Sequence, residues 1–195
     1  MRHAALWILV TGMVLVAWAA VPSTGVVAAE DERHGGGGGQ KNFSAKLVSF
    51  NEVPSISSGA QGTFRARLNQ AGDTLTYRLT YSGITDGAAV TQSHIHLGQR
   101  HTNGGIMVWL CSGTLTDPTG LAPACPAAPG GTVEGTLTAA NIIQTPASPA
   151  PPSPPAQGVG PGEFEKFVEA LREGAAYANV HSTRFPGGEL RGQVQ

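Results

Sequence analysis

Three histidines have the residue type and spacing that a metal site requires. His94 and His96 lie two residues apart in the segment Ser93–Gly98, and His181 lies in a separate segment of alternating residues. Residues two apart on a strand share a face, with Cα atoms about 7 Å apart. Because zinc and copper bind imidazole nitrogens at about 2.0–2.1 Å, the ring nitrogens must lie within about 4 Å of one another if the three histidines bind one ion. His101, in a nearby loop, is a candidate fourth ligand.

The same histidines have a second interpretation. Histidines on a polar sheet face also form hydrogen bonds to Asn, Ser or backbone carbonyl groups without binding an ion. Spacing alone does not separate a copper or zinc site from such a polar face, and both interpretations stay open.

Other catalytic arrangements lack support in the sequence. It contains no Gly-x-Ser-x-Gly and no phosphate-binding loop, and the glycine run 35–39 neither follows a strand nor opens a helix. The tightest group of carboxylates falls on the outward face of an expected helix, at Glu163, Glu165, Glu169 and Glu173. No residue therefore needs an enzymatic explanation.

Alternation of apolar and polar residues predicts the strands that must position the histidines. With 27 Gly, 14 Pro and 13% charged residues, the composition favours a turn-rich β protein. Period-two patterns predict eight strands, within 43–48, 64–68, 75–81, 91–97, 106–111, 132–138, 176–182 and 189–194. Because long helical crossovers are absent between them, we expect an antiparallel sandwich or barrel.

Two other segments interrupt this pattern. Phe164, Phe167, Val168 and Leu171 follow helical spacing, and Gly174 suits the position after a helix end, so one short helix is expected to close an end or edge of the sandwich. Residues 145–161 contain seven prolines and predict an exposed, extended loop insertion.

The N-terminal residues and the cysteines both predict export. Residues 1–29 have the order of a secretory signal peptide, an uncleaved anchor being the alternative, and residues 30–42 read as a flexible glycine-rich linker before a single domain, 43–195. Cys111 and Cys125 are the only cysteines, and in an oxidising compartment such a pair predicts a disulfide. We therefore expect a secreted protein, extracellular or periplasmic, with no membrane span after cleavage.

The C-terminal segment predicts a hairpin with two charged side chains on one face. Phe185–Gly188 reads as a turn, and Glu189 and Arg191 follow it two residues apart. Arg191 can pair with Glu189 or with another carboxylate such as Glu52. Glu189 can instead orient a metal-bound histidine through a hydrogen bond.

Three segments together resemble a known family. Asn51–Pro54 follows the first strand, His94–Gly98 lies in the middle, and the long block Ala176–Gln193 is the most specific part. Over Phe43–Gln193 the chain resembles a chordin-type (CHRD) domain. The resemblance implies an immunoglobulin-like β-barrel or sandwich with limited similarity to copper/zinc superoxide dismutases, including a His-x-His strand. The zinc cluster and bridging histidine of those enzymes are not evident here, so dismutase activity is not expected.

These observations predict an exported CHRD-domain module that binds or supports a protein or envelope partner and performs no defined catalysis. The alternative is a mononuclear copper or zinc protein that uses His94, His96 and His181, with redox activity if the ion is copper. A net charge of −1, from 12 basic and 13 acidic residues, gives no reason to expect a nucleic-acid partner. The oligomeric state is not predicted.

Overall fold

A computed structural model describes residues 39–143 and 157–195 of the chain. The predicted signal peptide, most of the predicted linker and residues 145–156 of the proline-rich segment lie outside the described residues. No helix in the described part is both long and apolar enough to span a membrane.

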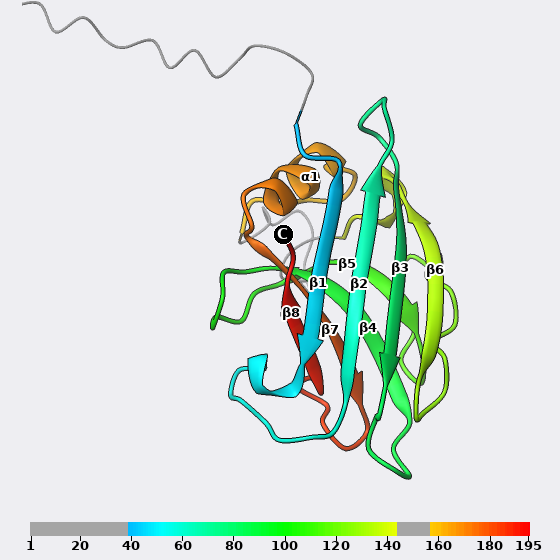
Figure 1. Cartoon of the computed structure of the whole chain (residues 1–195). Helices are drawn as coiled ribbons and strands as arrows, with labels where there is room; N and C mark the ends of the chain where they lie inside the picture. Colours follow the sequence, from blue (N-terminus) through cyan, green and yellow to red (C-terminus); the bar gives the residue numbers. More distant parts are fainter. Residues whose placement is uncertain (1–38, 144–156) are drawn as a thin grey trace, which may run out of the picture. The chain divides into compact units, whose positions relative to one another are not determined.

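The domain is an eight-stranded antiparallel sheet that nearly closes on itself (Figure 1). The spatial order of the strands is β5-β4-β7-β8-β1-β2-β3-β6. Their bounds are β1 Asn42–Val48, β2 Gln61–Leu68, β3 Leu75–Ser82, β4 Val90–Leu97, β5 Ile106–Ser112, β6 Gly131–Leu137, β7 Ala176–Ser182 and β8 Leu190–Gln193. All eight predicted strands are confirmed, as is the all-β antiparallel class.

The sheet folds into two layers. β1, β2, β3 and β6 form one layer, and β5, β4, β7 and β8 form the other (Figure 1). The two edge strands, β5 and β6, approach each other across the remaining seam. The buried Tyr77 hydroxyl on β3 crosses the interior and donates to the Leu110 carbonyl on β5 at 2.5 Å.

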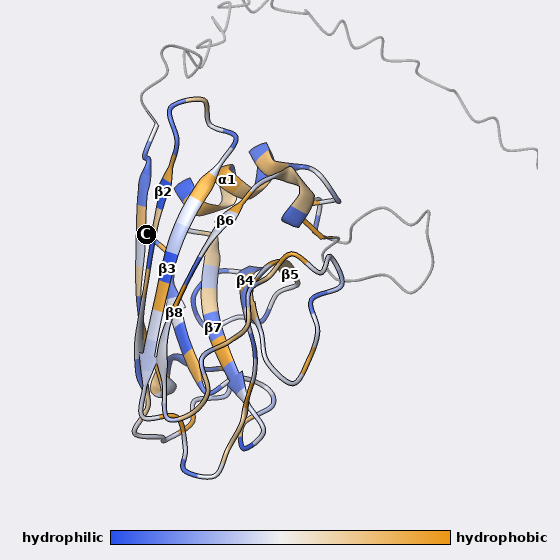
Figure 2. Cartoon of the chain, turned by 90° about the vertical axis from the view of Figure 1, so that its right-hand side faces the viewer, coloured by the Kyte–Doolittle hydropathy of each residue, from blue (hydrophilic) through white to orange (hydrophobic). Residues whose placement is uncertain are grey.

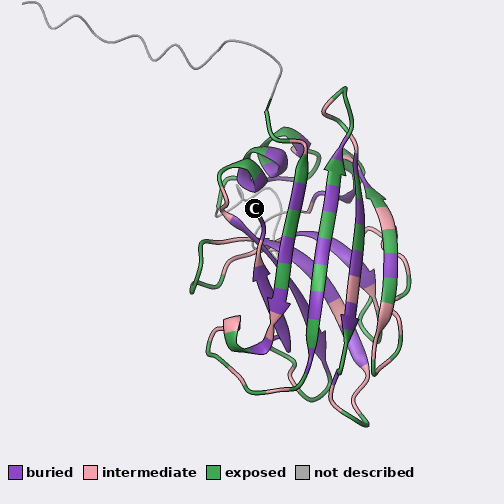
Figure 3. Cartoon of the chain, viewed as in Figure 1, coloured by how far each residue is buried: buried purple, intermediate pink, exposed green. Residues whose placement is uncertain are grey.

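The core lies between the layers because every second residue of each strand points inward. On β2 and β3, buried residues alternate with more exposed ones along the whole length, in step with the alternation of hydrophobic and hydrophilic residues (Figures 2 and 3). The largest fully buried side chains include Tyr81, Phe64, Phe167 and Leu47. Burial of each such side chain contributes about 1.5–3 kcal/mol to stability.

The predicted helix α1, Phe164–Arg172, is confirmed and lies at one end of the barrel (Figure 1). Its apolar stripe buries Phe164, Phe167, Val168 and Leu171, and Gly174 follows its end with φ +63°, a conformation that favours glycine. Short 3-10 helices, η1 Ser49–Asn51 and η2 Ala139–Asn141, follow β1 and β6.

Two predicted connections are also present. Residues 70–73 join β2 to β3 as a hairpin, and the turn at 185–188 joins β7 to β8. The predicted disulfide links Cys111 at the end of β5 to Cys125. The described end of the proline-rich segment docks on the β4–β5 connection, where Gln157 Oε1 accepts from the Gly105 N–H at 2.6 Å.

Candidate metal site on the sheet's outer surface

The histidine-bearing face lies on the outside of the β5-β4-β7-β8 layer. On β1, Phe43, Ala45 and Leu47 point into the core, so the next residue, Val48, points outward. Val48 is paired with Arg191 on β8. Continuing across the sheet, Arg191 pairs with Asn179, Asn179 with His94, and His94 with Trp109. Residues paired in this way share a face, so this row points away from the core. We name the face formed by Trp109, His94, His96, Tyr177, Asn179, His181 and Arg191 the covered face.

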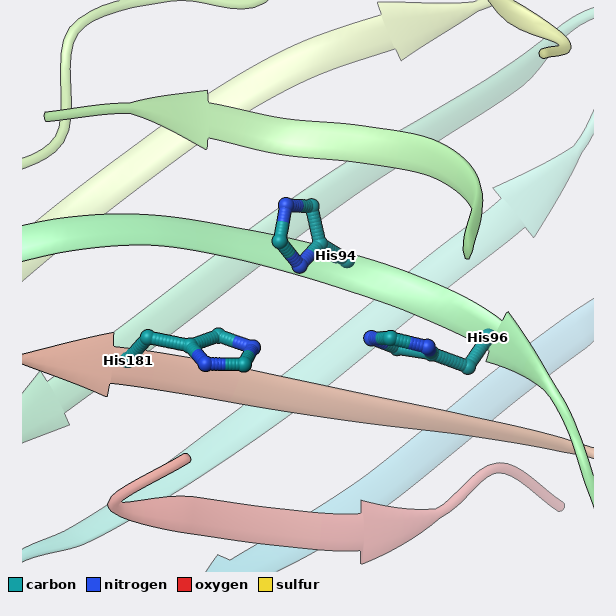
Figure 4. A group of neighbouring side chains, drawn as sticks. All are labelled: His94, His96 and His181. Atoms are coloured by element: carbon teal, nitrogen blue, oxygen red, sulfur yellow. The ribbon is translucent and has the colours of Figure 1, made fainter. Parts of the chain in front are cut away.

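Three histidines meet on the covered face (Figure 4). His94 and His96 come from β4, and His181 comes from the neighbouring strand β7. The ring centroid of His94 lies 5.4 Å from that of His96 and 5.1 Å from that of His181. One nitrogen from each ring lies within 4.8 Å of the others. The pairing of β4 with β7 therefore brings His181 next to two histidines that precede it by 85 residues or more in the sequence.

The three rings are buried although they lie outside the barrel. His94 is 0% exposed, His96 8% and His181 7%. Trp109 packs edge-on against the His94 ring at 4.4 Å, and Tyr177 stacks parallel to the His96 ring at 4.7 Å. Aromatic neighbours thus shield the imidazoles from water.

Hydrogen bonds from the loops fix two of the rings. His96 Nδ1 lies 2.9 Å from the Gly104 carbonyl, and His181 Nδ1 lies 2.9 Å from the Pro186 carbonyl. A carbonyl only accepts, so in a neutral ring the proton sits on Nδ1 and the lone pair on Nε2. In His181 the other nitrogen is unpaired, an arrangement typical of metal-binding histidines, whereas Nε2 of His96 faces the Asn179 side chain.

Several buried polar atoms of this region have no hydrogen-bond partner among the described residues. They include both nitrogens of His94, Nε2 of His181 and the indole nitrogen of Trp109. Leaving such a group unpaired costs about 1–3 kcal/mol. His96 Nε2 faces the Asn179 side-chain amide at 3.1 Å, and with the proton on Nδ1 a half-turn of that amide presents its NH₂ group to the lone pair.

Burial keeps the three imidazoles neutral. It lowers the pKa of His94 to about 2, and the neighbouring His181 and His96 act in the same direction. Burial lowers the pKa of His96 to about 4, against the opposing hydrogen bond to Gly104. The His181 pKa is also lowered by burial, against its bond to Pro186. Neutral imidazole is the form that coordinates metals.

The donor set fits copper or zinc with a modest closure of the rings. Bonds of about 2.0–2.1 Å to a tetrahedral ion place nitrogens about 3.4 Å apart. The nitrogens here lie within 4.8 Å of one another, so small side-chain rotations suffice to bring them to that spacing. Three imidazoles and one open position suit zinc and copper better than magnesium or calcium, which prefer oxygen ligands.

His101 lies apart from the three histidines. Its side chain is exposed in the loop between β4 and β5, where its backbone has φ +64°. It does not belong to the group of converging nitrogens.

Arg191 holds the loop that orients His96. Its guanidinium stacks on Tyr177, with the central carbon 3.4 Å from the ring centroid. It donates to Asn103 Oδ1 at 3.0 Å and to the carbonyls of Gln99 and Thr102. In the described chain Arg191 forms no ion pair with either expected carboxylate, so its role here is to fasten the loop that ends at Gly104.

The two carboxylates differ in their surroundings. Glu189 accepts from the N–H and hydroxyl of Thr85 and from Ser182, and none of its hydrogen bonds reaches a histidine, so it ties the end of β7 to a loop. Glu52 is buried against Gly188 with one oxygen unpaired. Burial raises the Glu52 pKa to about 7, although the charge of Arg191 opposes the shift.

Sequence reasoning missed most of the groups that surround the rings. Tyr177 and Asn179 precede His181 by four and two residues on the same strand, so the period-two rule could have placed them on its face. No local signal could have placed Trp109, Gly104 or Pro186, because strand pairing and loop paths bring them to the site.

Comparison with known proteins gives one match. Residues 43–194 match the family model of the CHRD domain. No curated protein and no solved structure matches the chain.

Proposed function

We propose that this chain, which belongs to the CHRD domain family, binds one transition-metal ion, copper or zinc, through His94, His96 and His181. The observation that carries the proposal is the convergence of three buried imidazoles, with one nitrogen from each ring within 4.8 Å of the others and with carbonyls holding Nδ1 of His96 and His181. Nε2 of His96 faces the Asn179 amide at 3.1 Å, so this side chain must turn aside when the ring coordinates an ion. A polar face that served only for hydrogen bonding would pair its buried nitrogens. Here His94 pairs neither of them with any described residue.

The chain's own residues have separate roles in this proposal. The Gly104 and Pro186 carbonyls hold the proton of each ring on Nδ1, and Trp109 and Tyr177 exclude water from the rings. A bound copper ion would supply one-electron chemistry, whereas zinc would supply a Lewis acid. We propose a binding module of an exported protein, since no described acid or base forms a hydrogen bond to these histidines, and the disulfide suits an oxidising compartment.

Calorimetric titration of the metal-free chain with Cu²⁺ and Zn²⁺ tests the proposal. We expect one ion per chain and a loss of at least a hundredfold in affinity for His96→Ala and for His94→Ala. His101→Ala is the matched control, because it removes an exposed histidine outside the cluster and should bind as the unchanged chain does. Equal losses in all three variants, or no binding at one equivalent, would refute the site.

Trp109 provides an optical check on the position of the ion. The sequence has three tryptophans, and two of them, Trp7 and Trp18, lie in the predicted signal peptide. In a chain with Trp7→Phe and Trp18→Phe, the emission comes from Trp109, whose ring lies 4.4 Å from that of His94. Stoichiometric Cu²⁺ should quench this emission, and His181→Ala should abolish the quenching at the same concentration.

A further inference from the structure

The outer face of the other layer has a distinct chemical character. We name the polar outward-facing side chains of β1, β2, β3 and β6 the open face; they are Asn42, Ser44, Lys46, Gln61, Thr63, Arg65, Arg67, Thr76, Arg78, Thr80, Ser82, Thr132, Glu134 and Thr136. Nearly all of these positions are exposed, and they form the exposed bands between buried ones on these strands in Figure 3. No large hydrophobic side chain is exposed on these four strands.

Positive charge is concentrated on the open face. Lys46, Arg65, Arg67 and Arg78 point outward from it, and Glu134 is its single carboxylate. The chain as a whole has a net charge of −1. The face therefore carries a net charge of +3, four cations against one anion, on a protein whose other regions are acidic on balance.

The pairing of β2 with β3 places two of these cations opposite each other, an arrangement that lowers the stability of the sheet. Arg65 on β2 pairs directly with Arg78 on β3, and like charges opposite each other destabilise a sheet. Arg78 is compensated by Glu134 on β6, with an N–O distance of 2.9 Å. Within the described ranges, the side chains of Arg65 and Arg67 have neither an ion pair nor a hydrogen bond. Two uncompensated guanidinium groups are thus available to a ligand.

A broad, shallow groove runs over these side chains. It encloses about 770 Å³, and Arg65, Arg67 and Arg78 line it together with Ser44, Thr76 and Thr136. Arg65 and Arg67 lie two apart on β2, so their Cα atoms are about 7 Å apart. The groove therefore offers a group of planar cations flanked by hydroxyl groups, with Glu134 as its one carboxylate.

We propose that the open face binds a linear acidic glycan, a polysaccharide that carries carboxylate or sulfate groups. Arginine forms paired hydrogen bonds with such anions, and threonine and serine hydroxyls match the hydroxyls of the sugar units. Binding of single-stranded nucleic acid uses exposed aromatic side chains for stacking, and insertion into a lipid surface uses exposed apolar ones. The four strands expose neither. This site is separate from the proposed metal site and does not depend on it.

Binding of the full chain to immobilised polysaccharides tests this proposal. The probes are polygalacturonate, which carries carboxylates, and dextran sulfate, which carries sulfates, with neutral dextran as the reference. All are measured with excess EDTA in about 50 mM NaCl, which is below physiological ionic strength and screens charges weakly. Chelation keeps the metal site out of the measurement, so failure here leaves the metal proposal untouched. We expect binding to at least one acidic glycan, none to dextran, and a marked loss as salt increases.

The decisive comparison is between two variants with equal charge. Arg65→Gln with Arg67→Gln should weaken glycan binding at least tenfold. Arg184→Gln with Lys166→Gln removes the same charge from a turn and from α1, outside the open face, and should change the affinity less than twofold. Equal losses in the two variants, binding to dextran, or tighter binding to single-stranded DNA than to either glycan would overturn the proposal. Matching urea midpoints of the two variants establish that both are folded.

Discussion

The two outer surfaces of one sheet follow the same alternation of residues but have opposite environments. The covered face places histidines, aromatic rings and Arg191 in a region that loops shield, whereas the open face leaves arginines and threonines in solvent. Arg191 is 2% exposed and makes three side-chain hydrogen bonds, while Arg65 is exposed and makes none in the described chain. The difference teaches that "outward" on a sheet is not the same as "solvated".

Replacing one arginine on each face should show the largest contrast. Arg191→Ala should lower the free energy of unfolding by roughly 4 kcal/mol, because it removes charged hydrogen bonds from buried partners. Arg65→Ala should change it by less than about 0.5 kcal/mol, since the side chain is exposed and faces a like charge. Urea unfolding measures both values. Similar values for the two variants would remove the distinction between the faces.

The disulfide should matter nearly as much, because it fastens a loop beside the covered face. Cys111 lies two residues after Trp109 on β5, and its bond to Cys125 closes a loop with a sequence separation of 14. Replacing both cysteines by Ala should cost about 3 kcal/mol, the value expected for a loop of this length. The midpoint of urea unfolding, compared with that of the unchanged chain in oxidising buffer, gives the cost. A cost near zero would mean that the loop is held by other contacts.

Acidification should destabilise the metal-free protein through the covered face. His96 has a folded pKa lowered to about 4, against about 6.5 in the unfolded chain, so the unfolded state takes up the proton first. Its stabilising contribution is present above pH 6.5 and is lost as the pH falls towards 4. The lowered pKa values of His94 and His181 act in the same direction, and the raised pKa of Glu52 acts oppositely.

A substitution isolates the contribution of one ring. In EDTA, His96→Gln should reduce the loss of stability between pH 7 and pH 5 by on the order of 1–2 kcal/mol. His101→Gln, at the exposed histidine outside the cluster, is the matched control substitution. Urea midpoints at the two pH values measure the effect. An unchanged slope in His96→Gln would show that this imidazole is not shielded in solution.

The smallest effect should come from a hydroxyl pair on the open face. Thr80 and Thr132 lie opposite each other on β3 and β6, with their hydroxyl oxygens 2.9 Å apart. Thr80→Ala should cost about 0.5 kcal/mol, the usual value of an exposed cross-strand pair. Thermal unfolding should shift by no more than a few degrees. A loss above about 2 kcal/mol would indicate that this face is covered too.

Local patterns sufficed to predict most of the fold. Period-two alternation predicted all eight strands, and helical spacing at Phe164 and Leu171 predicted α1. The disulfide was predictable because the sequence contains only two cysteines, and the turns at 70–73 and 185–188 were recognisable from Gly, Pro and Asp. The strands, the helix and the turns each depend on residues close together in the sequence, so a local pattern is enough to predict them.

The candidate site was only partly predictable. Spacing put His94 and His96 on one face, and His181 in a separate predicted strand was the candidate third ligand, but the loop position of His101 could not decide whether it joined them. The expected roles of Glu189 and Arg191 depended on which side chains their neighbours presented, and the hydrogen bonds of Glu189 go to Thr85 and Ser182. Those partners come from other parts of the chain.

The sequence by itself determined which residues alternate, and therefore which of them leave the core. Tertiary structure alone decided whether the outward residues are buried or exposed to solvent, because their burial depends on the loops and side chains that pack over them. The Gly104 and Pro186 carbonyls, Trp109 and Tyr177 enclose the three imidazoles on one layer, while no described loop covers Arg65 and Arg67 on the other. Covering desolvates a polar side chain and lowers the pKa of an imidazole, whereas exposure leaves an arginine charged and available.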